Sequence, residues 1–184
     1  MKQIVLILLG CSAGPVLASE PAALRFPHVL LDEKPPQNPW IKIVGDLNAD
    51  GRPDIILAPM QLKSGMHHIA WYKAPPDATA GNSKQHIIKE PVETVSHALA
   101  VADSDGDGKL DVAAARMHQE KHPQEVDVYL NTGGGLQWKR QVIATTGSYD
   151  IVAADLNGDG RTDLLGANHG GSYQPVELWR NGGR

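Results

Sequence analysis

The chain has 184 residues, of which 41% are hydrophobic and 21% charged, and its formal net charge is −4. This composition excludes a mainly disordered chain, and the lack of a Lys/Arg cluster argues against nucleic acid as a partner. Aromatic residues make up only 5%, whereas glycine (19) and proline (13) are frequent. The expected core therefore consists of Val, Ile, Leu and Ala on short strands between many turns.

Residues 1–18 have the pattern of an export signal. Lys2 precedes an apolar run over 4–9, and 16–18 (VLA) carries the small residues that a signal peptidase accepts. Gly10 interrupts the apolar run far short of the roughly 20 residues that a membrane span requires. We predict a removed signal peptide, no membrane span, and a secreted or periplasmic/extracellular protein.

The single cysteine leaves one alternative open. Cys11 follows Leu8-Leu9-Gly10, which is the pattern of a lipoprotein box, so a lipid anchor at Cys11 is the minority interpretation. Cleavage after Ala18 is the preferred one. It would leave the mature chain without cysteine and hence without disulfides.

Between the signal and the rest of the chain, the N-terminal segment 19–40 contains one strand-like run, 26–32 (FPHVLLD). It resembles the run that begins at His86 but has no strand-like neighbour before it. We expect it to complete a sheet whose other strands lie elsewhere in the sequence.

Residues 41–184 are organised by an internal repeat. A nine-residue acidic loop occurs three times, and its copies start 57 and 52 residues apart: 46–54 (DLNADGRPD), 103–111 (DSDGDGKLD) and 155–163 (DLNGDGRTD). A recurring period of this length is typical of solenoids, propellers and arrays.

Each loop lies between two apolar runs, and further runs with period-two alternation follow. The first runs are 41–45, 98–102 and 151–154, the second 55–60, 112–117 and 164–168, the third 69–73, 126–131 and 176–181, and the fourth 86–89 and 138–143. Four short strands per repeat predict an all-β protein made of three β-propeller blades.

The loops have the donors that calcium prefers. Ca²⁺ takes six to eight oxygens, and Asp or Asn at positions one, three, five and nine supply them here, together with the peptide carbonyl at position seven. About three Ca²⁺ per chain are predicted, with these ligands: Asp46, Asn48, Asp50, Arg52, Asp54, Asp103, Asp105, Asp107, Lys109, Asp111, Asp155, Asn157, Asp159, Arg161 and Asp163. The alternative is an Asx-type turn without metal. An EF-hand is excluded because position twelve is Leu57, Ala114 or Gly166 instead of Glu.

Over residues 41–184 this pattern resembles the FG-GAP or VCBS repeats of the integrin α-subunit propeller and of bacterial secreted proteins. The resemblance implies blades with one Ca²⁺ in each hairpin between the first two strands. Some secreted enzymes that act on sugars by elimination are similar in using calcium-bearing propellers with such repeats.

A second site is a weaker prediction. His118 and His169 follow the second strand of successive repeats, and His97 and Tyr149 precede the first strand. Equivalent positions in a propeller lie on one face, so these groups are expected around one mouth of the channel, where a sugar would fit. Acid–base catalysis by the histidines is one interpretation, and hydrogen bonding to neighbouring loops is the other.

Three blades do not readily close a ring, since propellers typically have at least four. Two chains that exchange the run 26–32, paired with 176–181, would give a six-bladed homodimer. The other interpretations are a piece of a longer propeller and an open arc.

The leading functional hypothesis is a calcium-binding module for a polysaccharide or a surface protein. A carbohydrate lyase or sugar dehydratase is the second hypothesis, and a purely structural repeat unit is the third.

Overall fold

The computed structural model describes residues 24–33, 35, 39–59, 68–77, 81, 83–92, 96–116, 124–168 and 174–183. The predicted signal peptide, Cys11, His118 and His169 lie outside these residues. Within them, no helix has the length and apolar character that a membrane span needs.

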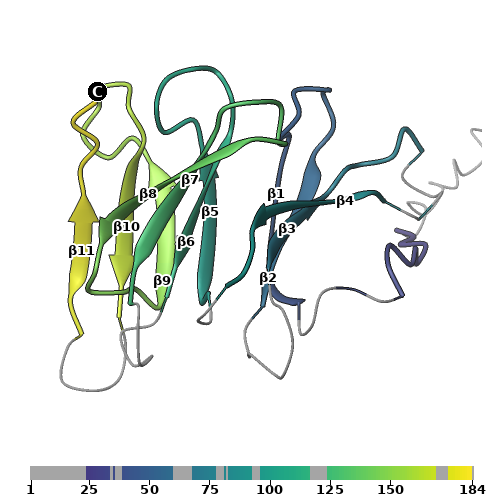
Figure 1. Cartoon of the computed structure of the whole chain (residues 1–184), viewed down its shortest axis with the longest axis horizontal. Helices are drawn as coiled ribbons and strands as arrows, with labels where there is room; N and C mark the ends of the chain where they lie inside the picture. Colours follow the sequence, from purple (N-terminus) through teal and green to yellow (C-terminus); the bar gives the residue numbers. More distant parts are fainter. Residues whose placement is uncertain are drawn as a thin grey trace, which may run out of the picture.

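The described residues form eleven strands in three antiparallel sheets (Figure 1). Sheet one contains β1 (Pro39–Gly45), β2 (Asp54–Pro59), β3 (Ile69–Tyr72) and β4 (Gln85–Lys89). Sheet two contains β5 (Ala98–Ala102), β6 (Asp111–Ala115), β7 (Val126–Asn131) and β8 (Trp138–Ala144). Sheet three contains β9 (Asp150–Ala154), β10 (Asp163–Ala167) and β11 (Val176–Trp179). The strands follow one another in sequence order in every sheet, which confirms the all-β prediction and is consistent with propeller blades.

The three sheets stand side by side in sequence order. Their first strands β1, β5 and β9 are neighbours, and the acidic loops that follow these strands lie at one end of the molecule (Figure 1). The pairing register repeats from sheet to sheet: Ile43 lies opposite Ile56, Ala100 opposite Ala113, and Val152 opposite Leu165. Residues at the same loop position are therefore structurally equivalent.

Apolar side chains fill both joins between sheets. In the first join, Ile56 and Trp71 of sheet one belong to one buried cluster with Val112 and Tyr129 of sheet two. In the second join, Val128 of sheet two belongs to a cluster with Ile151 and Leu164 of sheet three. Period-two alternation explains this arrangement, because successive residues of a strand face opposite neighbours.

The run 26–32 does not form its predicted strand within the single chain. The structure assigns no strand to residues 24–33, which lie against sheet one instead. The Tyr72 hydroxyl donates a hydrogen bond to Asp32 Oδ2 (2.7 Å). Pairing with β11 is not made because sheet two stands between the segment and sheet three.

Candidate metal centre

The three acidic loops have the same backbone arrangement. The carboxylate at position one accepts hydrogen bonds from N–H groups further along its own loop: Asp103 accepts from Gly106 (2.8 Å) and Gly108 (2.9 Å), and Asp155 accepts from Gly158 (2.7 Å) and Gly160 (2.9 Å). The glycines at position six have φ of 82° to 84°, a region that side chains disfavour. The predicted sharp turn at position six is confirmed.

The carboxylate at position nine is buried and fastens the loop to the third strand. Asp111 accepts one hydrogen bond from the Ser104 N–H (2.9 Å) and another from the Asn131 N–H (2.8 Å). Asp54 and Asp163 make the equivalent pairs. Burial raises the pKa of Asp54 and Asp111, although the N–H donors act in the opposite direction. Burial therefore disfavours the ionised carboxylates, and a bound cation would offset that effect.

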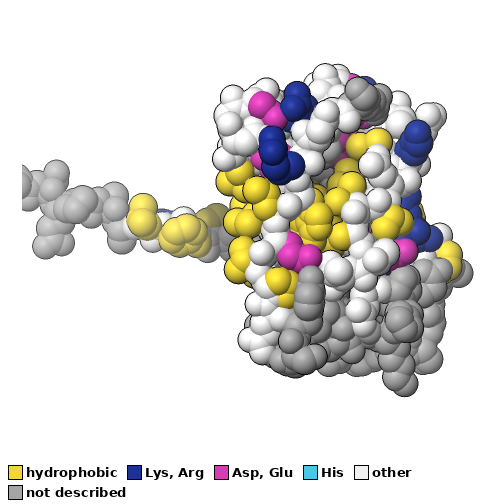
Figure 2. Space-filling model, turned by 90° about the vertical axis from the view of Figure 1, so that its left-hand side faces the viewer, with side chains coloured by type: hydrophobic (Ala, Val, Ile, Leu, Met, Phe, Trp, Pro, Cys, Tyr) yellow, Lys and Arg dark blue, Asp and Glu magenta, His cyan; other side chains and the backbone are white. Residues whose placement is uncertain are grey.

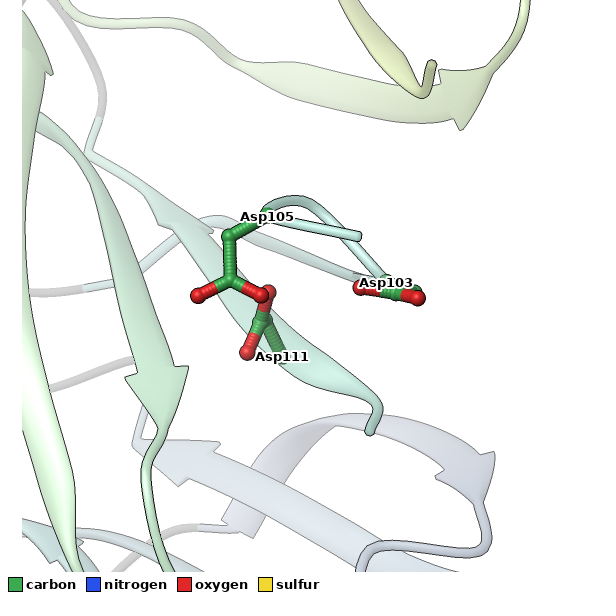
Figure 3. Close-up of side chains that lie close together, drawn as sticks. All are labelled: Asp103, Asp105 and Asp111. Carbon is green, nitrogen blue, oxygen red and sulfur yellow. The ribbon is translucent and has the colours of Figure 1, made fainter. Parts of the chain in front are cut away.

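Sheet two carries a carboxylate triad, Asp103, Asp105 and Asp111, with one oxygen of each within 4.8 Å of the others (Figure 3). Among the described residues it is the one group of three or more side chains of metal-ligating type. Three carboxylates form a hard oxygen donor set, which suits Ca²⁺ or Mg²⁺ better than a thiophilic metal. The triad thus fits the ion that the loop spacing predicts.

At position five, each acidic side chain forms an ion pair with the basic side chain two residues later. The Asp107 carboxylate forms an ion pair with Lys109 Nζ (2.6 Å), and the equivalent pairs are Asp50 with Arg52 (2.6 Å) and Asp159 with Arg161 (2.6 Å). In each loop the basic side chain at position seven therefore holds the acidic side chain at position five. The structure does not group Asp107 with the triad.

Loops one and three have an asparagine at position three, so they offer fewer carboxylates. Asn48 lies beside Asp54, to which its Nδ2 donates (3.0 Å), and its Oδ1 is buried with no hydrogen-bond partner in the described part of the chain. Such an oxygen is available to a cation. Asn157 is exposed and donates to Asp159 Oδ2 (3.0 Å). The position-seven carbonyls and the count of three ions remain predictions.

The structure brings two of the predicted second-site residues together. The His97 and Tyr149 rings lie 3.8 Å apart between centroids, and His97 Nδ1 is 3.1 Å from the Tyr149 carbonyl oxygen. Their N–H groups donate to the equivalent carbonyls of Ala115 and Ala167. This geometry supports the hydrogen-bonding interpretation of His97, which links sheet two to sheet three.

Two asparagines that the sequence analysis did not interpret connect successive repeats. Asn131 Nδ2 donates to the Leu47 carbonyl (2.8 Å) in the loop of sheet one and to the Leu110 carbonyl (3.2 Å) in its own loop. Asn181 Nδ2 donates in the same way to Ser104 (2.7 Å) and Thr162 (3.1 Å). We call Asn131 and Asn181 the latch asparagines. Their shared place, at the end of the third run of their repeats (126–131 and 176–181), was the only sequence signal.

A buried ion-pair network was also missed. The guanidinium of Arg116, which is 2% exposed, contacts Asp127 (2.9 Å) and Glu125 (2.9 Å). Arg140 contacts the same two carboxylates. Each buried charge has an opposite partner, as burial requires, so the network is part of the structure of sheet two.

Asp105→Asn is expected to lower calcium affinity about tenfold, because ligand charge tunes such sites. Asp107→Asn is its matched control: both residues lie on the same loop, but the Asp107 carboxylate is paired with Lys109. Titration calorimetry of both variants measures the difference. An equal or larger loss for Asp107→Asn would place position five in the coordination shell.

Comparison with protein families identifies FG-GAP-like repeats at residues 46–114 and 103–166. The two matches together span all three acidic loops. No curated protein matches the chain.

Proposed function

Because the chain belongs to the family of FG-GAP-like repeat proteins, we propose that it is an exported calcium-binding module whose loop end binds a polysaccharide or a surface protein. The observation that carries the proposal is the carboxylate triad of Asp103, Asp105 and Asp111. Its donor set is that of a hard cation, and it lies on a loop at the same end of the molecule as the other two (Figure 1).

Calcium would be held by the triad, by water and by the Lys109 carbonyl. The bound ion supplies positive charge that neutralises the clustered carboxylates. The protein itself orders the rest of the loop. The carboxylate at position one accepts hydrogen bonds from N–H groups of the loop. The carboxylate at position nine accepts one from the loop and one from the third strand. The loop is thus arranged before the ion binds, which reduces the entropy lost on binding.

The location of the loops supports an external polar partner. Asp103 and Asp105 are only partly buried, and the adjoining Gly106 to Gly108 are exposed, so ligand oxygens can approach this side of the centre. A Ca²⁺ ion takes six to eight oxygens, more than three carboxylates and one carbonyl provide as single donors. The remaining positions can accept hydroxyl or carboxylate oxygens of a glycan, or carboxylates of a protein.

A glycan array that includes uronic-acid polymers, probed with the purified chain in calcium and in EGTA, tests the proposal. Calcium-dependent binding that Asp105→Asn weakens and Asp107→Asn retains is the expected result. The same samples are assayed for new unsaturated chain ends, which would assign a lyase activity instead. Calcium binding without any glycan or surface-protein ligand would contradict the binding module and favour a structural repeat unit.

A further inference from the structure

We propose that two copies of this chain join end to end, with the outer face of sheet three of each copy against the outer face of sheet one of the other. The proposal does not depend on the identity of the proposed ligand, although the second copy would border the cavity that Asp103 and Asp105 help to line. It rests on the two joins inside the chain, which show what each face of a sheet is built to contact.

The outer face of sheet three is apolar and uncovered. The equivalent positions on the second and third strands of sheets one and two face the next sheet and are at most 5% exposed: Ile56, Ala58, Ile69, Trp71, Ala113, Ala115, Val126 and Val128. In sheet three this face includes Val152, Val176 and Leu178, which are 54%, 73% and 47% exposed. Figure 2 looks onto this face and shows apolar side chains gathered across its centre. The pattern that is buried twice within the chain is therefore repeated a third time on the surface.

The outer face of sheet one has apolar side chains at most of the positions that face the preceding sheet at the first join. Val44, Ile55 and Leu57 occupy the positions that Val101, Val112 and Ala114 take at the first join, and Val44 is 59% exposed, whereas Lys42 stands at the position of Leu99. The N-terminal segment already lies on this face, with Val29 and Leu31 beside Tyr72.

That segment occupies the place of a preceding sheet's fourth strand. In the first join, Ile88 of β4 belongs to the same cluster as Val112 and Tyr129 on the face of sheet two. Tyr72 is the equivalent of Tyr129, and Val29 and Leu31 line one pocket with Tyr72, whereas Ile88 belongs to the same cluster as Tyr129. Phe26 and Leu30 of the segment are 88% and 54% exposed, so they have apolar surface still to bury.

In sheet three, no described residue of the same chain fills the position of the fourth strand. In the described residues β11 has one neighbour, β10, and a cavity of about 530 Å³ lies between sheets two and three beside it. The cavity is lined by Val128, Ser104 and Thr162, among others. At the first join the equivalent positions hold the larger Trp71, Leu47 and Leu110, and Trp138 of the fourth strand β8 packs against that cluster. A fourth strand beside β11 would cover this cavity with a side chain, as Trp138 does at the first join, and the segment of the second copy would supply that strand.

The contact between the two copies would lack the latch hydrogen bond that is present at both joins within the chain. Ala74 occupies the latch position of sheet one, because its N–H donates to Asp54 as that of Asn131 does to Asp111. The Leu156 carbonyl, which is equivalent to those of Leu47 and Ser104, would therefore receive no latch from the second copy. Ala74→Asn should add that hydrogen bond and tighten the pair.

The test is light scattering coupled to size exclusion on the purified chain in calcium, over a concentration series. Wild type is expected at twice the chain mass, Val176→Asp at the chain mass, and Ala74→Asn to lower the dissociation constant about tenfold. Leu136→Asp, an exposed apolar residue on another surface, is the control and should remain a dimer. Circular dichroism verifies that each variant is folded.

Three results would overturn the proposal. One is a monomer for both wild type and Ala74→Asn at every concentration. Another is a dimer that Val176→Asp leaves intact, which would place the contact elsewhere. The last is a monomer whose tryptophan fluorescence changes on adding an oligosaccharide, blocked in Trp179→Ala, which would make the cavity a sugar site.

Discussion

Removal of calcium is expected to lower the melting temperature by roughly 5–10 °C for each site emptied. An ion present at about 100 times its dissociation constant stabilises the folded state by about 2.7 kcal/mol. For a domain of this size, 1 kcal/mol corresponds to about 2–4 °C. Calorimetry with calcium, and then with EGTA on protein verified as metal-free, measures the shift.

The effect follows from the carboxylates that the fold brings together. Asp103, Asp105 and Asp111 place three negative charges within a few ångströms, and burial already raises the pKa of Asp111. Without a cation, mutual repulsion and desolvation both disfavour the folded loop. The calcium-dependent shift should shrink in Asp105→Asn and persist in Asp107→Asn. Coincident melting curves with and without calcium would rule out a structural ion.

The strands and loops were predictable because they depend on local patterns. An apolar run predicted the strand 98–102 and a run with period-two alternation predicted 126–131, and these are the bounds of β5 and β7. The repeated loop predicted the glycine turn at position six for the same reason: a tight turn of this kind requires a positive φ wherever it occurs.

The ion pairs at position five were not predicted. Spacing alone placed Asp107 among the ligands, because alternate residues of a short loop were expected to point inward. The structure pairs Asp107 with Lys109, two residues away. An acidic residue followed at i+2 by Lys or Arg in all three copies was the available signal for this ion pair.

Contacts between repeats were beyond a local analysis. The Asn131 amide meets the Leu47 carbonyl across 84 residues of sequence, and no pattern within either segment indicates the other. Only the register of the complete sheets brings them together. The same holds for the N-terminal segment, whose contact with Tyr72 of sheet one no local pattern indicates.

Asn131→Ala is expected to destabilise the protein by about 3 kcal/mol, because it removes several hydrogen bonds of roughly 1 kcal/mol each and leaves buried partners unsatisfied. Asn131 is 1% exposed. Its Nδ2 holds the carbonyls of two acidic loops, and its Oδ1 accepts hydrogen bonds from Gly133 (3.3 Å) and Gly135 (2.8 Å). Denaturant unfolding monitored by tryptophan fluorescence measures the change.

Asn181→Ala is the matched control, since it removes the same latch from the second join. Asn181 is only partly buried and its neighbours Gly182 and Gly183 are exposed, so water can replace part of what is lost. The expected loss is about 1 kcal/mol. Asn131→Ala should also weaken calcium binding to the triad, because the Asn131 amide holds the carbonyl of Leu110, which directly precedes Asp111. The backbone N–H that Asp111 accepts is retained in this variant. Equal losses of stability for the two variants, or undiminished calcium affinity in Asn131→Ala, would show that the latch does not couple the joins to the metal centre.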